Sequence, residues 1–189
     1  MPAIELRPGF FMFAIVLAAL DRSGSVLPIL CAMAVHELAH IVMMLACGGQ
    51  VRRLTLRFAD LQIAASGLGY RQELLSALAG PLVNLICGAA FCMQRPSFAA
   101  YSLMLGIYNL LPVWPLDGGR MIRCVLLARL PITQAEHISE IVSFAACAVL
   151  LLIGVFLTFF RKSGLWPLGT AAYLTVRLLM LARRTDAVQ

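Results

Sequence analysis

The sequence predicts an all-α integral membrane protein with about six transmembrane helices and a small β-hairpin between the second and the third. The chain of 189 residues is 61% hydrophobic and only 13% charged, whereas about a quarter of residues are charged in soluble domains. Its mean hydropathy is +0.90. The apolar residues form six runs, and the segment between the second and third run alternates with period two instead. This length leaves no room for a sizeable second domain, so residues 1–189 are expected to form one membrane-embedded domain.

The first apolar run, residues 8–20, is short for a crossing that needs about 20 residues. It must use flanking residues or local thinning of the bilayer, or lie partly in the interface. Arg7 and the small residues after the run also resemble a signal peptide, but no convincing cleavage site follows, so we interpret it as a retained span. The other five runs are each about long enough to cross. They are residues 25–47, 74–93, 97–117, 138–160 and 164–182.

Residues 51–65 predict a β-hairpin, because apolar residues alternate with polar ones on both sides of a short break at Ala59 and Asp60. An extended loop is the alternative. A strand with a free edge could pair with an extended peptide.

The net charge of +6 is spread over the ends of the apolar runs and forms no basic patch with interleaved aromatic residues. The basic residues are therefore read as topology signals and lipid head-group contacts, with the lipid bilayer as partner and no nucleic acid. With both termini in the cytoplasm, the basic residues outside the sixth run favour the cytoplasmic side ten to four, as the positive-inside rule requires. The ten are Arg7, Arg52, Arg53, Arg57, Arg71, Arg120, Arg123, Arg129, Arg183 and Arg184, and the four are Arg22, Arg95, Arg161 and Lys162.

The second run carries the pattern H-E-x-x-H at His36, Glu37 and His40. Residues four apart lie on one face of a helix, so the two imidazoles can bind one zinc ion, the usual geometry of this pattern. Glu37 can act as a base on a water whose pKa the metal lowers. Ionisable groups inside an apolar membrane segment are costly and mark functional sites. The pattern predicts a zinc-dependent site, although a glutamate and two histidines with ordinary polar partners would show the same letters.

A zinc ion held by two histidines needs a third protein ligand and an open position for water. Nine acidic residues are present, and elimination by position favours Asp117 at the end of the fourth run. Pro112 and Pro115 precede it and break the helix, and the two glycines after it permit unusual backbone angles. Broken backbone at membrane depth survives only where protein or a wet cavity satisfies it. The alternative is a plain helix end with Asp117 as the N-cap of the next helix.

Together, these motifs resemble those of the site-2 protease family, the intramembrane zinc metalloproteases of peptidase family M50. That family pairs H-E-x-x-H in one transmembrane helix with N-x-x-P-x-x-x-x-D-G in a later one. Asn109, Pro112, Asp117 and Gly118 form the second pattern here, and residues 80–84 resemble a further G-P-x-x-N signature. The resemblance covers about residues 30–125. The compact form resembles the bacterial branch that includes a sporulation protease acting on a sigma-factor precursor.

The resemblance implies that His36, His40 and Asp117 bind Zn²⁺ and that Glu37 is the general base and then the general acid. It also implies that Asn109 positions the substrate or polarises the scissile carbonyl.

Two further polar residues have weaker signals. Asn84 is interpreted as a hydrogen-bonding residue between helices, with substrate contact as the alternative. His137, beside a predicted span boundary, is interpreted as a solvated loop histidine.

We therefore expect an intramembrane zinc endopeptidase that hydrolyses a peptide bond in or near a transmembrane segment of a membrane protein. A membrane-tethered transcription factor or a sigma-factor precursor would be such a substrate, and a regulatory membrane partner is left open. The protein is expected in the cell membrane as a multi-pass protein with its active site toward the cytoplasmic side. The substrate must unwind locally, and the hairpin could hold it.

Two alternatives remain. The first is a catalytically silent membrane protein that binds a metal or a client. Glu37 argues against it, because structural zinc needs no neighbouring base. The second is another membrane metalloprotease family with H-E-x-x-H and a glutamate as third ligand, against which the motif from Asn109 to Gly119 argues.

Overall fold

The computed structural model describes residues 3–6, 21, 24–57, 60–161 and 164–186. The chain divides into two compact units, Met1–Asn109 and Leu110–Gln189. The sequence-based assignment of one domain to residues 1–189 stays a prediction.

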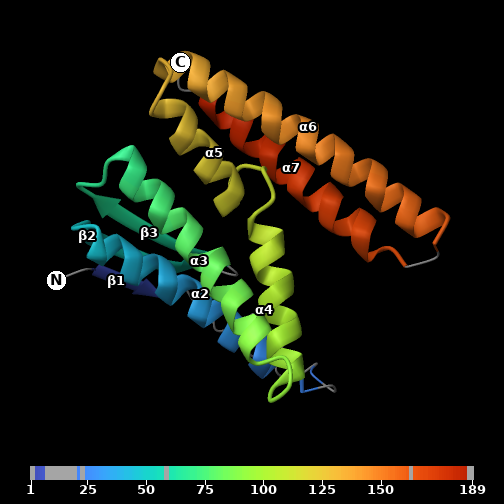
Figure 1. The fold of residues 1–189 in the computed structure, drawn as a ribbon. Helices are drawn as coiled ribbons and strands as arrows, with labels where there is room; N and C mark the ends of the chain where they lie inside the picture. Colours follow the sequence, from blue (N-terminus) through green and yellow to red (C-terminus); the bar gives the residue numbers. More distant parts are fainter. Residues whose placement is uncertain (1–2, 7–20, 22–23, 58–59, 162–163, 187–189) are drawn as a thin grey trace. The chain divides into compact units, whose positions relative to one another are not determined.

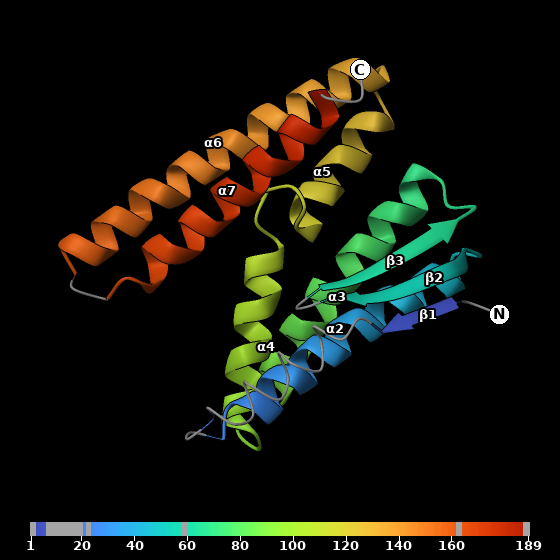
Figure 2. The same ribbon diagram turned by 180° about the vertical axis from the view of Figure 1, so that it is seen from behind.

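In its described residues, the first unit contains three helices and a three-stranded sheet (Figure 1). Its elements are β1 (Ala3–Leu6), α2 (Val26–Ala46), β2 (Gln50–Arg57), β3 (Asp60–Ser66), α3 (Tyr70–Ala90) and α4 (Pro96–Asn109). Helix α2 packs against α3 and α4, and α3 packs against α4. The sheet lies alongside α2 and α3 in both views (Figures 1 and 2). Helix α2, which packs against both other helices, carries the H-E-x-x-H segment.

Polar side chains fix the two ends of α2. The carboxylate oxygens of Asp21 accept hydrogen bonds from the backbone N–H groups of Ser25, at 3.1 Å, and Val26, at 2.8 Å. These are N–H groups that the first turn of a helix leaves without a partner. At the other end, Gln72 Nε2 at the start of α3 donates to the carbonyl oxygen of Cys47 at 3.0 Å. The start of α3 is thereby tied to the end of α2.

The sheet has the strand order β1-β2-β3, with β1 parallel and β3 antiparallel to β2. Leu54 lies opposite Ile63, and Arg57 lies opposite Asp60. Strands β2 and β3 therefore pair over the residues where the sequence predicts a hairpin, while residues 58–59 of the predicted turn lie outside the described residues. The pairing of β1 was not predicted. It makes β2 the central strand, so the edges of the described sheet belong to β1 and β3.

Small residues allow α3 and α4 to approach closely, as is common between membrane helices. A Cβ atom added at Gly88 of α3 would lie 2.7 Å from Leu103 Cδ2, and one added at Gly106 of α4 would lie 3.0 Å from the carbonyl oxygen of Pro81. A side chain at either position would therefore force its neighbours to shift.

The second unit contains α5 (Asp117–Leu127), α6 (Ile132–Phe159) and α7 (Trp166–Asp186). Helices α6 and α7 run side by side in opposite directions (Figures 1 and 2). Gly154 of α6 lies against the backbone of α7, where an added Cβ would be 3.0 Å from Leu168 Cα. Helix α5 is joined to α6 by Arg123, whose Nε lies 3.1 Å from both carboxylate oxygens of Glu136.

Three helices in the described part of the chain are long and apolar enough to cross a membrane. They are α2, α3 and α6. The structure therefore supports a helical membrane protein, but it does not support the predicted six crossings. The predicted first span, residues 8–20, lies outside the described residues.

The predicted fourth span, residues 97–117, is wrong as a single helix. Helix α4 ends at Asn109 after 14 residues, and Asp117 begins α5 rather than ending a span. Pro112 and Pro115 lie between the two helices. Proline lacks the N–H that a helix interior needs, and it disfavours helical backbone in the residue before it.

Candidate metal centre

The histidines of the H-E-x-x-H segment face one another within the first unit. Both side chains are buried on α2, and their Nε2 atoms are 3.1 Å apart. The rings meet edge to face, with centroids 4.6 Å apart. The four-residue spacing therefore brings two ring nitrogens together, as the sequence predicts.

Helix α3 orients His40. The Nδ1 atom of His40 lies 2.6 Å from the carbonyl oxygen of Ser76. A carbonyl oxygen only accepts hydrogen bonds, so Nδ1 carries the proton. The lone pair of His40 is therefore on Nε2, the nitrogen that faces His36. Metal-binding histidines are usually oriented in this way by a second hydrogen bond.

Gly80 of α3 allows the two imidazoles to occupy this space. A Cβ atom added at Gly80 would overlap His40 Nε2 and would lie 2.8 Å from His36 Cε1. Any side chain at this position would therefore displace the histidine rings.

Asn84 of α3 contacts His36. The Nδ2 atom of Asn84 lies 3.2 Å from Nδ1 of His36. The side chain of Asn84 is fully buried, with 0% exposure. The predicted hydrogen bond of Asn84 between two helices is thus present, and its partner is His36 of the candidate site.

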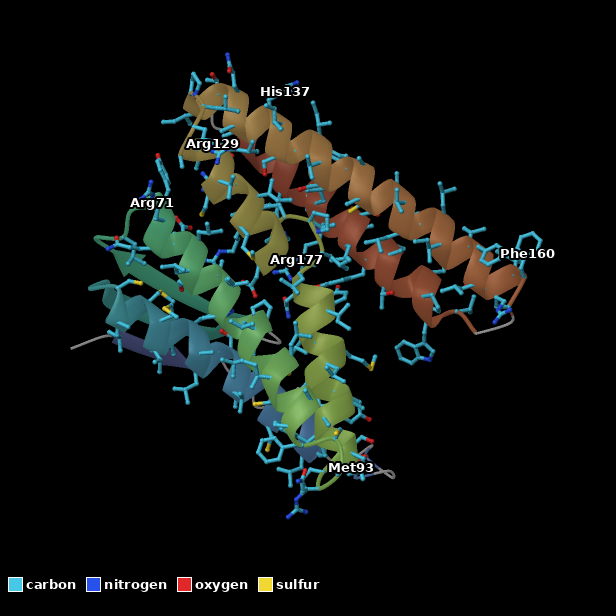
Figure 3. The ribbon with its side chains drawn as sticks, viewed as in Figure 1. Arg71, Met93, Arg129, His137, Phe160 and Arg177 are labelled. Carbon is cyan, nitrogen blue, oxygen red and sulfur yellow. The ribbon has the colours of Figure 1, made fainter. Side chains whose placement is uncertain are left out.

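Three other residues singled out in the sequence are Glu37 and Asn109, in the first unit, and His137, in the second. Glu37 is half-buried on α2, beside His36. Asn109 is half-buried as the last residue of α4, where its Nδ2 donates to the carbonyl oxygen of Leu105 at 3.1 Å. His137 is exposed on α6 and projects outward from the helix (Figure 3).

In the second unit, Asp117 is the first residue of α5 and is buried, with 7% exposure. A carboxylate in the first turn of a helix is favoured by the helix dipole. Its Oδ1 atom lies 3.5 Å from Nη1 of Arg120, one turn later.

The glycines after Asp117 are required by close packing. A Cβ atom added at Gly118 would overlap the carbonyl oxygens of Leu110 and Leu111, and one added at Gly119 would lie 2.5 Å from the backbone nitrogen of Trp114. Neither glycine is among the described glycines with positive φ. The expectation of unusual backbone angles at these glycines is wrong, because they form the first turn of α5 while the preceding loop folds against them.

The loop before α5 is also held to α6. The backbone N–H of Trp114 donates to Ser143 Oγ at 3.1 Å, and the guanidinium of Arg123 lies 5.6 Å from the centre of the Trp114 ring. Asp117 therefore follows a loop in which Trp114 is held by Ser143 of α6 and by Arg123 of α5.

The histidine pair fits a zinc ion. Two nitrogen ligands at 2.0–2.1 Å from a tetrahedral zinc ion are about 3.3 Å apart, and the two Nε2 atoms are 3.1 Å apart. The proton on Nδ1 of His40 leaves Nε2 able to bind a metal. The ligand chemistry and the spacing of the pair are therefore those of two corners of a zinc tetrahedron.

Known proteins resemble this chain in sequence and in fold. The family model described as peptidase family M50 matches residues 95–153, which include the segment from Asn109 to Gly119. A zinc metalloprotease of Methanocaldococcus jannaschii is 27% identical over 172 residues, covering 80% of this chain and 51% of its own length. Stage IV sporulation protein FB of Bacillus subtilis is 25% identical over 169 residues, covering 82% of this chain and 58% of its own.

This chain is similar to the site-2 protease family, peptidase family M50, in the segment that the family model matches and in these relatives. The solved structure of a site-2 protease from Methanocaldococcus jannaschii matches with a TM-score of 0.66 at 20% identity, covering 94% of this chain and 89% of that one. The resemblance predicted from the sequence is thus confirmed, and the fold agrees with it. The chain spans about half the length of the curated relatives it matches, 51% and 58%.

Three contributions to the site were not predicted from the sequence. They are the carbonyl of Ser76, the absence of a side chain at Gly80 and the contact of Asn84 with His36. The G-P-x-x-N signature at residues 80–84 marked two of these positions without showing what they touch.

Proposed function

We propose that this chain is an intramembrane zinc metalloendopeptidase. The observation that carries the proposal is the buried pair of facing Nε2 atoms, 3.1 Å apart, on a helix that is long and apolar enough to cross a membrane. Such a pair beside Glu37 suits hydrolysis better than structural metal binding, because a structural zinc site needs no adjacent base. The resemblance to the site-2 protease family supports the same conclusion.

His36, His40 and Asp117 are the proposed zinc ligands. The two histidines supply neutral imidazole nitrogens, and Asp117 supplies a buried carboxylate at the start of α5. Three protein ligands leave one tetrahedral position open, as in catalytic zinc sites. When bound, zinc supplies a Lewis acid that lowers the pKa of water and polarises a peptide carbonyl.

Glu37 is the proposed general base and acid. It takes the proton from water as the water oxygen attacks the scissile carbonyl carbon, and it then passes that proton to the leaving amide nitrogen. Its half-buried position on α2, next to His36, suits both transfers.

Asn109 is the proposed substrate contact. Its Nδ2 atom gives one N–H to the carbonyl oxygen of Leu105, and a side-chain amide has two. The second N–H can donate to a substrate carbonyl at the end of α4, while the first bond holds the amide in place.

The proposed substrate is a transmembrane or membrane-associated segment of another protein, such as a membrane-tethered transcription factor or a sigma-factor precursor. A helical peptide bond is shielded by its own backbone, so the segment must unwind before it is cut. Strand β3 supports the idea of an extended substrate, because it lies at an edge of the described sheet and edge strands pair with peptides.

The proposed location is the cell membrane, with the chain crossing more than once and its active site toward the cytoplasmic side. The excess of basic residues on that side supports this orientation. A second membrane protein that binds this chain and regulates cleavage is compatible with the proposal.

The decisive experiment compares the wild-type protein with Glu37→Gln in detergent. We expect about one zinc ion per chain in both, measured by elemental analysis, because glutamine leaves the ligands in place. We expect cleavage of a panel of single-span bacterial membrane proteins only by the wild type, with a loss of at least about 10²-fold in Glu37→Gln.

Asp117→Ala is the matched control for the metal. It should lose zinc as well as cleavage, while Glu37→Gln loses cleavage alone. Zinc in the wild type without cleavage of any panel protein would favour a silent membrane protein that binds a metal or a client. Proteolysis by Glu37→Gln would refute the role assigned to Glu37.

A further inference from the structure

Three residues of α3 form a stripe against the histidines of α2. Ser76, Gly80 and Asn84 follow one another at intervals of four, so they lie on one face of the helix. Ser76 contacts His40, Asn84 contacts His36, and Gly80 leaves room for both rings. Each histidine therefore meets a polar group of α3 at its Nδ1 atom.

The orientation of the Asn84 amide decides which nitrogen of His36 can bind a metal. As placed, Nδ2 faces Nδ1 of His36 at 3.2 Å. A donor in that position would require Nδ1 to accept, and the proton of a neutral ring would then be on Nε2. Nε2 is the atom that faces Nε2 of His40 at 3.1 Å, so this tautomer would put a proton where the metal ligand is needed.

A half-turn of the amide removes this conflict. The oxygen and nitrogen of a side-chain amide are nearly equivalent in shape and are assigned from their hydrogen bonds. As placed, Asn84 Oδ1 is buried and has no hydrogen-bond partner among the described residues, so the half-turn gives up no hydrogen bond of this oxygen. Turning the amide places Oδ1 against Nδ1 of His36, where it accepts the Nδ1–H and leaves the lone pair of the ring on Nε2.

We propose that Asn84 is a positioning residue for the metal, whose Oδ1 accepts the Nδ1–H of His36 as the carbonyl of Ser76 accepts that of His40. The inference rests on the zinc site proposed above. Helix α3 then provides two hydrogen-bond acceptors, the carbonyl of Ser76 and Oδ1 of Asn84, with Gly80 between them. These acceptors hold both imidazoles with Nε2 toward the metal.

The same geometry argues against direct contact of Asn84 with substrate. Its amide lies at Nδ1 of His36, and a metal with its substrate would lie at Nε2, a different edge of the ring. The side chain is also fully buried.

The test measures zinc affinity of the full chain in detergent by competition with a chromophoric chelator. Asn84→Leu removes the acceptor at similar size, and we expect its affinity to fall by about 10- to 100-fold, the usual effect of losing such a partner. Asn84→Asp keeps an acceptor and removes the donor. We expect its affinity to equal or exceed that of the wild type.

Two controls separate positioning from folding. Ser102→Ala removes another fully buried polar group, on α4, and should leave zinc affinity unchanged. Asn84→Ala replaces the leucine variant if the latter lowers Tm. A second readout is the ¹⁵N spectrum of the zinc-loaded protein labelled at its three histidines. It should show a protected Nδ1–H for His36 in the wild type but not in Asn84→Leu.

The outcomes are distinct. Unchanged affinity in both Asn84→Leu and Asn84→Ala would overturn the inference and leave the zinc site intact. Equal weakening in Asn84→Asp and Asn84→Leu would also overturn it, because Asn84 would then act as a donor. A wild-type protein that binds no zinc at all would overturn the proposed function, and the role of Asn84 with it.

Discussion

At the scale of single residues, Gly80 is the position where the least change should have the largest effect on the site. Its hydrogen atoms face both imidazole rings, and a single methyl group would overlap His40 Nε2. Packed interiors respond to the addition of one carbon atom. The rings would have to move, and the moving atoms include a proposed ligand nitrogen.

We expect Gly80→Ala to lower zinc affinity by at least about 10-fold, comparable to the loss of an orienting partner. Chelator competition measures the affinity. Gly88→Ala is the matched control, because it adds the same methyl group to α3 where it meets Leu103 instead of a histidine. It should lower stability by about 1–3 kcal/mol and leave zinc affinity unchanged. Equal zinc affinity in Gly80→Ala and the wild type would contradict the close contact at Gly80.

The pairing of the two histidines could be predicted from the sequence, but their orientation could not. The four-residue spacing of His36 and His40 brings their Nε2 atoms to 3.1 Å, while their metal binding and the role of Glu37 stay proposals. The acceptor for His40 is a backbone carbonyl, which any residue at position 76 would supply. Asn84 was correctly expected to hydrogen-bond between helices, but its partner depends on how α2 and α3 pack.

At the scale of elements, the boundary between α4 and α5 is set by backbone chemistry that hydropathy does not register. Leucine, valine and tryptophan continue the apolar run after Asn109, so residues 97–117 look like one span. The helix nevertheless ends at Asn109. The two prolines of this segment were recognised, but their effect on the length of the fourth span was not.

The sheet shows the opposite case, since period-two alternation located β2 and β3 while nothing in residues 3–6 indicated a third strand. Pairing with β1 depends on a contact between distant parts of the chain. It also decides which strand a test of substrate binding should alter. Proline at Leu54 or Leu56 would break the central strand, whereas proline in β3 can act on an edge.

We expect Gln62→Pro and Ile63→Pro, both in β3, to reduce cleavage while zinc content stays unchanged. Neighbouring residues of an antiparallel strand direct their N–H groups to opposite edges. One of the two variants therefore removes an N–H from the free edge and keeps the pairing with β2. Cleavage of a panel substrate and elemental analysis are the measurements. Wild-type cleavage rates in both variants would exclude substrate pairing on β3.

At the scale of the whole molecule, the helices differ in how well their lengths match a bilayer. Helices α2 and α3 have 21 residues each, about 31 Å, which matches a hydrocarbon layer of about 30 Å. Helix α6 has 28 residues, about 42 Å. Helix α4 has 14 residues, about 21 Å, and it packs against α3. From these lengths we expect the segment that follows α4 to begin within the apolar layer.

This mismatch predicts that cleavage depends on bilayer thickness. Thin bilayers bring lipid head groups and water closer to the end of α4, and thick bilayers bury it more deeply. We expect cleavage by the reconstituted protein to be faster in lipids with acyl chains of about 14 carbons than in those with about 22 carbons. Zinc content and the amount of folded protein should be equal in both. A rate that is independent of chain length would contradict the placement of this segment at membrane depth.

The shortness of α4 has one more consequence. Asn109, the proposed substrate contact, ends a helix of 14 residues. With the start of α4 at one membrane surface, Asn109 would lie at a fixed depth beneath that surface. A substrate helix that advances 1.5 Å per residue would reach this depth at a nearly constant number of residues from its own entry into the bilayer. The length of α4 would then determine the cleavage site. The site would depend on the distance of a peptide bond from the membrane surface rather than on the residues that flank that bond.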